Sequence, residues 1–310
     1  MIKTNFALSS SPHIRDNDST KSIMRDVVIA LIPATIAGVY FFKTQALLVI
    51  LTTVISCVVT EYVWQKITKR PITIGNYSSV VTGLLLAFNV PPTLPLWMAV
   101  VGSVFTILIV KEFFGGIGQN IVNPALAGRA FLLACYPVAM TTWKMDGITS
   151  ATPLAILKSH QGNLPSLYNV FIGHVGGCIG ETSALALLIG AAYLFYKRII
   201  TWHIPVSYIA TVLILTTIIG RNGLMTGNGI YEIFAGGLML GAFFMATDYT
   251  TSPMTANGQI VFGIGCGFLA TVIRIFGGYP EGVSYSILIM NLFVPLIDKY
   301  VTPRVFGEVK

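Results

Sequence analysis

Residues 26–64 read DVVIALIPATIAGVYFFKTQALLVILTTVISCVVTEYVW, two long apolar runs (26–42 and 45–64) with a short break around Lys43. Each run is close to the ~20 residues that an α-helix needs to cross the hydrocarbon core of a bilayer. Because the break is so short, the second helix must return alongside the first. The stretch therefore predicts two antiparallel membrane-spanning helices.

The same pattern continues along the rest of the 310 residues. Further apolar runs fall at 77–89, 95–112, 124–140, 180–196, 203–220, 230–247, 259–276 and 284–301. Hydrophobic residues make up 54% of the chain and charged residues 10%, with a mean hydropathy of +0.76, whereas soluble domains carry about 25% charged residues. We therefore expect one all-α integral membrane domain over residues 1–310, with about ten transmembrane helices and no folded soluble catalytic domain.

Positive charge predicts the orientation of these helices. Of the 19 Lys and Arg residues, Arg129 falls within a run, and if the N-terminus is inside, thirteen others lie on the inner side. The five on the outer side are Lys43, Lys144, Lys158, Arg221 and Arg274. This bias predicts a multi-pass membrane protein, with residues 1–23 and the C-terminus cytoplasmic and the loop 141–179 extracytoplasmic. The net charge of +7 is spread singly among the runs, so we expect no nucleic-acid partner.

Two runs are too short to cross a membrane comfortably. Residues 77–89 end at Asn89-Val90-Pro91-Pro92, and residues 124–140 begin at Asn123-Pro124; proline cannot donate to the helix ladder. The sequences GLLLAF (83–88) and FFGG (113–116) are echoed by GLMLGAF (237–243) and IFGG (275–278). An odd number of spans per half predicts two inverted five-helix repeats with broken helices, an arrangement that places sites at the repeat interface.

One hydroxyl-rich stretch in the outward loop, DGITSAT at 146–152, precedes a proline and has the composition of an ordinary turn. Its order also resembles the flavinylation sequence Asp-x-x-Ser/Thr-Gly-Ala-Thr, whose last threonine carries FMN through a phosphoester bond. The matching positions are Asp146, Thr149, Ala151 and Thr152, and Ser150 stands where glycine is usual. The resemblance implies a covalent FMN on Thr152.

Side-chain amides gather before the run at 124–140. Asn123 followed by Pro124 is typical of a helix start, and a glycine-rich loop that caps this helix is the simpler interpretation. Asn120 and Asn123 beside the positive helix end could instead hold a ring that gains negative charge on reduction. Arg129 would be costly facing lipid, so we expect it to face the bundle interior. The four cysteines lie far apart without a CxxC motif, so no metal site is expected.

Several short motifs occur in a fixed order along the chain. They are Ser11-Pro12-His13, Ile23-Met24, Thr82-Gly83-Leu84-Leu85, Gly115-Gly116, Asn123-Pro124-Ala125, Gly128-Arg129, the 146–152 stretch, Thr247-Asp248 and Ser252-Pro253. In this order the chain resembles a family of membrane subunits from the Rnf ion-translocating electron transport complex (the RnfD type) and from the sodium-translocating NADH:quinone oxidoreductase (the NqrB type). The quinone-reducing members normally have a longer N-terminal extension, which favours the Rnf type.

The resemblance implies a subunit of a prokaryotic cell (inner) membrane that is not active alone. It implies a covalent FMN, a noncovalent riboflavin beside Asn120 and Asn123, and electron flow between ferredoxin and NAD coupled to Na+ or H+ translocation. Implied partners are the A, B, C, E and G components of the Rnf complex, a flavin transferase during maturation, and membrane lipid. No residue is expected to act as a catalytic acid or base. Asp248 is the candidate for ion coupling, because the homologue has an acidic residue there.

The remaining acidic residues near span ends are expected for the most part to be interfacial. They are Glu61, Glu112, Glu181, Glu232 and Glu281. Two alternatives stay open: a subunit of the quinone-reducing type, and a carrier or channel of inverted-repeat type without redox chemistry. Composition and topology are the same for all three functions, so only the 146–152 and 120–124 stretches favour the flavin-carrying subunit.

Overall fold

The computed structural model describes residues 19–145, 148–149, 151–159, 163–220, 223–225 and 227–302, and most of them are helical. The first half contains α1 (Thr20–Ile67), the 3-10 helix η1 (Ile74–Asn76), α2 (Ser78–Phe88), α3 (Leu96–Val104), the π-helical η2 (Phe105–Glu112), α4 (Pro124–Cys135) and α5 (Pro137–Thr141). The connecting region contains β1 (Lys144–Met145), β2 (Ile148–Thr149), α6 (Pro153–Ser159) and α7 (Leu167–Ile172). The second half contains α8 (Ala184–Tyr196), α9 (His203–Ile218), β3 (Ile219–Gly220), β4 (Gly223–Leu224), α10 (Gly229–Phe234), α11 (Leu238–Leu240), the π-helical η3 (Gly241–Met245), α12 (Ala256–Phe276) and α13 (Val283–Tyr300).

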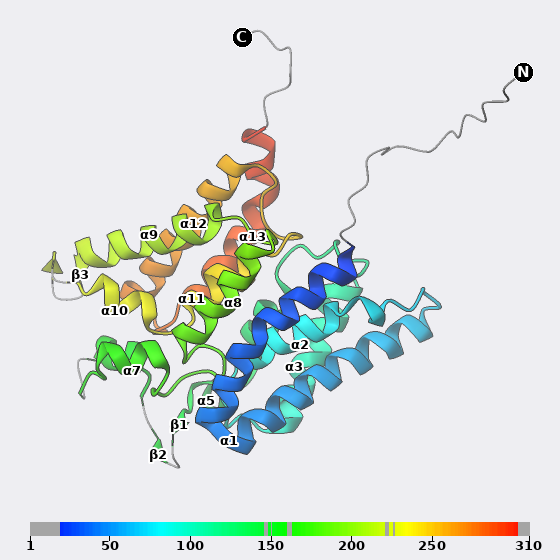
Figure 1. Cartoon of the computed structure of the whole chain (residues 1–310), viewed down its shortest axis with the longest axis horizontal. Coiled ribbons are helices and arrows are strands. Elements are labelled where there is room, and N and C mark those ends of the chain that lie inside the picture. Colours follow the sequence, from blue (N-terminus) through cyan, green and yellow to red (C-terminus); the bar gives the residue numbers. More distant parts are fainter. Residues whose placement is uncertain are drawn as a thin grey trace, which may run out of the picture.

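The first predicted helix pair is present as α1. The backbone of Lys43 leaves the helical region (φ 57°, ψ −142°), and α1 reverses direction there. Figure 1 shows the two arms of α1 running to the far end of the molecule and back. Ser19 and Ser22 form a capping box that starts the first arm. The break at Lys43 and the two helical arms are therefore confirmed.

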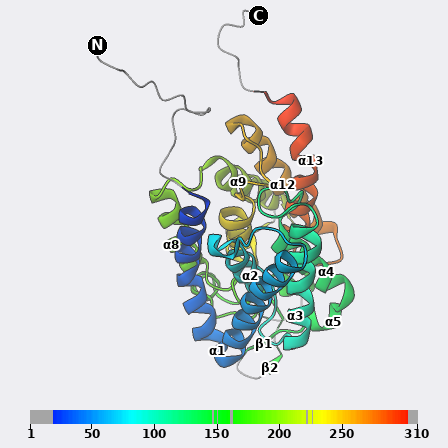
Figure 2. The ribbon, with the colours of Figure 1, turned by 90° about the vertical axis from the view of Figure 1, so that its right-hand side faces the viewer.

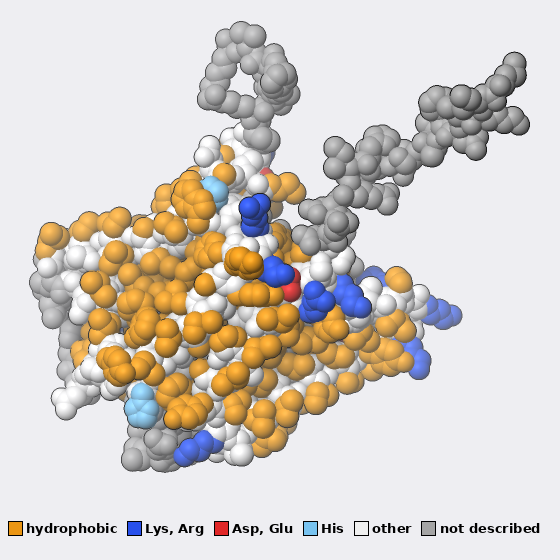
Figure 3. All heavy atoms as spheres, viewed as in Figure 1, with side chains coloured by type: hydrophobic (Ala, Val, Ile, Leu, Met, Phe, Trp, Pro, Cys, Tyr) orange, Lys and Arg blue, Asp and Glu red, His pale blue; other side chains and the backbone are white. Residues whose placement is uncertain are grey.

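Two of the described helices, α1 and α12, are long and apolar enough to cross a membrane, and α2, α4, α8 and α9 are shorter apolar helices. Many large hydrophobic side chains are exposed on the outside of the bundle, and the face in Figure 3 is mostly hydrophobic. Water-soluble proteins rarely expose apolar patches larger than a few hundred Å². This surface agrees with the predicted membrane domain.

The short runs form short helices, as predicted. Residues 77–89 give the 11-residue α2, and residues 124–140 give the 12-residue α4 followed by α5. The run at 230–247 is also broken, between α10 and α11, which the sequence analysis did not anticipate. Arg274 donates there to the carbonyl oxygens of Glu232 (2.8 Å) and Ala235 (3.3 Å). The break is tolerated because these buried carbonyl groups find a donor.

The broken helices meet in the middle of the bundle. Asn89, at the end of α2, donates to the carbonyl oxygen of Leu85 (2.6 Å) and lies 3.5 Å from the sulfur of Met245 in η3. The backbone amides of Ile179 and Gly180 donate to the carbonyl oxygens of Val90 and Phe88. The end of α2 is thus covered by a segment that lies about ninety residues further along the chain.

The core forms where the two halves pack together. Fully buried members include Leu31, Phe88, Leu187, Tyr208 and Phe262. Figure 2 shows α1 and α8 side by side, and these helices approach closely where Gly190 faces the carbonyl oxygen of Ala30. Two small hairpins, β1–β2 and β3–β4, are the described departures from the all-α prediction.

Candidate functional site

Helix α4 contributes to two cavities. Asn123 caps its first turn, and the side-chain Oδ1 accepts from the backbone amides of Ala125 (3.1 Å) and Leu126 (3.3 Å). Asn123 lines one cavity, named here the Asn123 cavity. Arg129 lines the other, the Thr152 cavity. Asn123 and Arg129 are six positions apart in the sequence, which corresponds to ~9 Å along a helix axis.

The two cavities lie toward opposite ends of the bundle. Ile23 and Met24, at the start of α1, line the Asn123 cavity. Thr141 and Trp143, which immediately precede β1, line the Thr152 cavity. Figure 1 shows β1 and β2 at the end of the molecule far from the start of α1 and the end of α13. The structure therefore separates the two sets of predicted cofactor residues.

The Thr152 cavity has a volume of about 440 Å³. Its wall includes Arg129, Trp143, Thr152, Tyr279, Glu281 and Tyr285. Thr152 is only 4% exposed, and its Oγ1 accepts from the backbone amide of Ala155 (3.2 Å) at the start of α6. The threonine predicted to carry FMN thus has its hydroxyl group fixed at the edge of a cavity.

The rest of the 146–152 stretch is only partly described. Ala151 lines the Thr152 cavity. Thr149 belongs to β2, where its backbone is described, and Asp146 and Ser150 lie outside the described residues. The roles of these residues in FMN attachment stay predictions.

Arg129 faces the bundle interior, as expected, where it contacts four polar side chains. Its Nη1 donates to Asn89 Oδ1 (3.2 Å) and Ser284 Oγ (2.7 Å) and lies 3.2 Å from Glu181 Oε1. Its Nη2 donates to the carboxylate of Glu281. One guanidinium group is therefore paired with two carboxyl groups at the wall of the Thr152 cavity.

The two carboxyl groups differ in their acidity. Burial and the neighbouring Glu281 raise the pKa of Glu181 well above its usual range. Burial also opposes ionisation of Glu281, but the guanidinium group of Arg129 outweighs it and lowers the pKa of Glu281. Both residues lie in segments that connect helices. Glu281 is therefore the ionised partner of Arg129.

Four of the five acidic residues expected at span ends have side chains that are buried among the helices, and their depth in the membrane stays a prediction. Glu61, Glu112, Glu181 and Glu232 are buried within the bundle. Lys111 Nζ donates to Glu61 Oε2 (2.6 Å), and Arg274 Nη1 lies 3.7 Å from Glu232 Oε2. A buried charge persists only when it is paired, so a basic residue inside an apolar run was the available signal for a buried acid.

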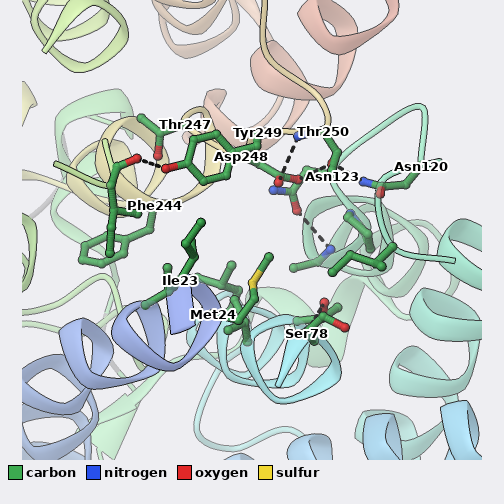
Figure 4. Close-up of a pocket in the computed structure, with 18 of the residues that line it drawn as sticks. Ile23, Met24, Ser78, Asn120, Asn123, Phe244, Thr247, Asp248, Tyr249 and Thr250 are labelled. Atoms are coloured by element: carbon green, nitrogen blue, oxygen red, sulfur yellow. Dashed lines mark hydrogen bonds between the residues drawn. The ribbon is translucent and has the colours of Figure 1, made fainter. Parts of the chain in front are cut away.

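The Asn123 cavity encloses about 90 Å³. Figure 4 shows Asn123, Asp248 and Thr250 close together, across the cavity from Ile23 and Met24. Asn120 Nδ2 donates to Thr250 Oγ1 (2.9 Å), and Thr250 Oγ1 lies 3.1 Å from Asp248 Oδ2. The two predicted asparagines and the predicted ion-coupling aspartate thus share one site.

The two asparagines have different roles in this site. Asn123 caps α4 through Oδ1 and donates through Nδ2 to the carbonyl oxygen of Met245 (3.2 Å). Both polar atoms of its side-chain amide are therefore hydrogen-bonded to the protein backbone. The described residues offer no donor to Asn120 Oδ1, which leaves that atom able to accept from a ligand. Sequence reasoning missed Lys111, which also lines this cavity and donates to Ser78 Oγ (2.7 Å).

Burial raises the pKa of Asp248, although hydrogen bonds from Thr250, Thr251 and Asn120 oppose the shift. Asp248 lies in the loop after η3, outside the membrane-spanning helices. A carboxyl group with a raised pKa gains and loses its proton more easily near neutral pH than an ordinary aspartate.

Comparisons with known proteins were made over the whole chain. The model of the NQR2, RnfD, RnfE family matches residues 7–307. The chain is 53% identical to the D component of the Na(+)-translocating ferredoxin:NAD(+) oxidoreductase complex of Acetobacterium woodii, covering 100% of this chain and 98% of that protein. It is 49% identical to the D component of the proton-translocating ferredoxin:NAD(+) oxidoreductase complex of Clostridium ljungdahlii, covering 99% and 98%. It is 35% identical to the D component of the ion-translocating oxidoreductase complex of Halorhodospira halophila, covering 98% and 96%.

Proposed function

We propose a function for this chain, which belongs to the NQR2, RnfD, RnfE family: it is the RnfD-type membrane subunit of an Rnf-type ferredoxin:NAD oxidoreductase. In this proposal it relays electrons between a covalent FMN on Thr152 and a second flavin near Asn120. The observation that carries the proposal is the Thr152 hydroxyl group held at the edge of a cavity with an arginine in its wall.

The Thr152 cavity suits a covalent flavin in size and in chemistry. Its volume of about 440 Å³ lies within the ~300–1,000 Å³ typical of small-molecule sites. Trp143, Tyr279 and Tyr285 supply aromatic walls, and Arg129 supplies a buried positive charge. When bound, FMN provides one- and two-electron chemistry. Arg129 stabilises negative charge in the cavity, and the bond to Thr152 would fix the position of the cofactor.

The Asn123 cavity suits only part of a second flavin. Its 90 Å³ is well below the size of a small-molecule site. Asn120 would accept a hydrogen bond from one edge of the ring, and Met24 and Phe244 would provide apolar contact. In the proposed function the rest of a riboflavin lies at the open mouth of the cavity, where a partner subunit of the complex covers it.

The proposed membrane arrangement has ten spans in two inverted five-helix repeats, with both chain ends cytoplasmic. It is supported by three interruptions of the helical chain, after α2, before α4 and within the 230–247 segment, which meet between the two halves. With this orientation Thr152 lies on the outer side and Asn120 on the inner side. The relatives are named for Na+ in one case and for protons in another, so the transported ion stays open, with Asp248 as the candidate coupling residue.

The cofactor proposal is tested by the mass of the intact, denatured subunit after co-expression with a flavin transferase. We expect one FMN adduct, fluorescent on a denaturing gel, that is lost in Thr152→Ala. Thr141→Ala is the matched control, because Thr141 lines the same cavity but lies outside the flavinylation stretch, and it should keep the adduct. An unmodified wild-type subunit, despite an active transferase, would favour the carrier or channel without redox chemistry.

A further inference from the structure

The charges around Arg129 do not balance. Glu181 and Glu281 approach one guanidinium group from two different connecting segments, and both lie beside Thr152 in a narrow hollow that adjoins the Thr152 cavity. Glu181 is only 3% exposed, and neither of its carboxylate oxygens has a hydrogen-bond partner among the described residues, although Oε1 lies 3.2 Å from Arg129 Nη1. One carboxyl group is therefore short of a positive partner.

The neighbouring elements do not supply that partner. The charged and titratable groups around the pair are Arg129 from α4, Cys178 from the same segment as Glu181, Arg274 from α12 with Glu232 from α10, and the cavity-lining Tyr279 and Tyr285. Lys158, in α6, is the cation nearest to Thr152 in the sequence. Arg274 is engaged by Glu232 and by two carbonyl oxygens. Lys158 donates to the carbonyl oxygens of Gly277 and Tyr279. Each of these cations already has a partner.

A buried unpaired carboxylate is costly, and such groups are neutralised by protonation. Two carboxylates in one site cannot both ionise freely, so one proton is shared between them. A metal ion is a poorer solution here. The ligand atoms of Cys178, Glu181 and Glu281 lie within 4.8 Å of one another, but the guanidinium group of Arg129 already contacts Glu281 and would repel a second cation.

We propose that Glu181 and Glu281 form a proton-binding pair that compensates the charge of the cofactor on Thr152. One proton is held on Glu181 and shared with Glu281 while the cofactor is oxidised. When one electron reaches the cavity, one proton from water adds to the carboxylate of Glu281, and Arg129 remains charged. When the electron leaves for the next carrier, the proton returns to water, so electron and charge balance at each step. The redox-linked part rests on the proposed function.

The physical reason is the low dielectric of the bundle interior. An added negative charge near Arg129 weakens the electrostatic stabilisation of the Glu281 carboxylate, because the reduced cofactor and Glu281 compete for one guanidinium group. The affinity of Glu281 for a proton therefore rises when the cofactor is reduced. Asn89 and Ser284 keep Arg129 in place by accepting from its Nη1, so the protonation changes without movement of the arginine.

The resting proton is tested first by infrared spectroscopy of the purified complex. The oxidised wild-type protein should show the carbonyl stretch of a protonated carboxylic acid, which shifts in D2O. Glu181→Gln and Glu281→Gln should each remove that band, because the remaining carboxylate then pairs with Arg129 alone. Asp298→Asn is the control, because Asp298 lies in α13 and its hydrogen-bond partner is the backbone amide of Met254, away from the pair. A wild-type protein without the band would overturn the proposal, whatever the variants do.

The redox-linked proton is tested by the midpoint potential of the covalent flavin as a function of pH. The wild-type potential should fall by ~59 mV per pH unit, since a tenfold change in an equilibrium constant corresponds to that value for one electron. The slope should decrease in Glu181→Gln and Glu281→Gln but not in Asp298→Asn. Equal slopes in all four proteins would overturn the proposal. An infrared band that disappears when Na+ is added at constant pH would also overturn it, because the pair would then bind Na+ in place of the proton. Absence of an FMN adduct from the wild-type subunit would instead contradict the proposed function. The infrared band would still decide whether Glu181 and Glu281 share a proton in the resting protein.

Discussion

Arg129 and Asn123 belong to the same short helix, yet their side chains enter different cavities. Asn123 donates to the backbone carbonyl of Met245 beside the Asn123 cavity, whereas Arg129 pairs with Glu181 and Glu281 beside Thr152. The sequence indicated that Arg129 faces the interior, because a charge is costly in lipid, and that Asn123 caps the helix. It could not indicate which cavity each would reach, because that depends on partners more than forty positions away.

The two asparagines should respond differently to truncation. Asn120→Ala should reduce the noncovalent flavin recovered with the complex and lower thermal stability less than Asn123→Ala, because Asn120 donates to Thr250 and to the carbonyl oxygen of Val122 and caps none of the described helices. Asn123→Ala should reduce the flavin and also lower the melting temperature, because loss of a helix cap costs about 1 kcal/mol. Flavin content after denaturation and thermal unfolding are the measurements. Unchanged flavin content in both variants would remove this cavity from the proposed relay.

Asp248 should make stability depend on pH in a defined direction. Its pKa is raised in the folded protein, so the protonated form is favoured there. Its contribution to stability is therefore present at low pH and is lost as the pH rises through the raised value, by about 1.4 kcal/mol for each unit of difference in pKa. Asp248→Asn should flatten the melting temperature between acidic and neutral pH. Asp298→Asn, on the surface of α13, is the control, and identical profiles for both variants would contradict the prediction.

At the scale of elements, the fold depends on where helices stop. The ends of α2 and α4 were predictable from Asn89, the following prolines and the Asn123-Pro124 start, because these signals are local. The break after α10 was not, because its exposed carbonyl groups are satisfied by Arg274 from α12. A helix can end wherever a distant donor satisfies its last carbonyl groups, and no residue in the 230–247 run reveals that donor.

The packing of α4 against η2 should control both cavities together. A Cβ atom at Gly128 would overlap Thr106 Oγ1 and lie 3.2 Å from Leu86 Cδ1. Gly128→Val should therefore displace α4, cost about 1–3 kcal/mol by overpacking, and reduce both flavins at once. Gly75→Ala is the control, because a Cβ there meets nothing within 4 Å. Loss of only one flavin in Gly128→Val would show that the two cavities do not depend jointly on α4.

At the scale of the whole molecule, the two ends of the bundle carry different features. The start of α1 and the end of α13 lie at one end, and the β1–β2 hairpin lies at the other (Figure 1). The distribution of Lys and Arg predicted this separation, because loops rich in positive charge stay on the cytoplasmic side. The separation of the two ends is confirmed, and the compartment that each faces stays a prediction.

Cysteine labelling tests the predicted orientation. Asn163, in the loop before α7, and Lys69, after α1, are both exposed. In a variant whose exposed Cys135 is replaced by serine, Asn163→Cys should react with a membrane-impermeant maleimide in intact cells. Lys69→Cys should react only after lysis. The opposite pattern would place Thr152 in the cytoplasm and reject the relay between two faces of the membrane.

The sequence by itself determined the membrane class, the helical segments, the reversal at Lys43 and the short α2 and α4, because the hydropathy and caps of a segment depend on its own residues. It also singled out Thr152, Asn120 and Asp248 as candidates. Only the tertiary structure decided that Arg129 lies beside Thr152, that Glu61 and Glu181 are buried, and that the two cavities are separate. A charge is stable inside a bundle only with its partner, and the fold alone brings those partners together.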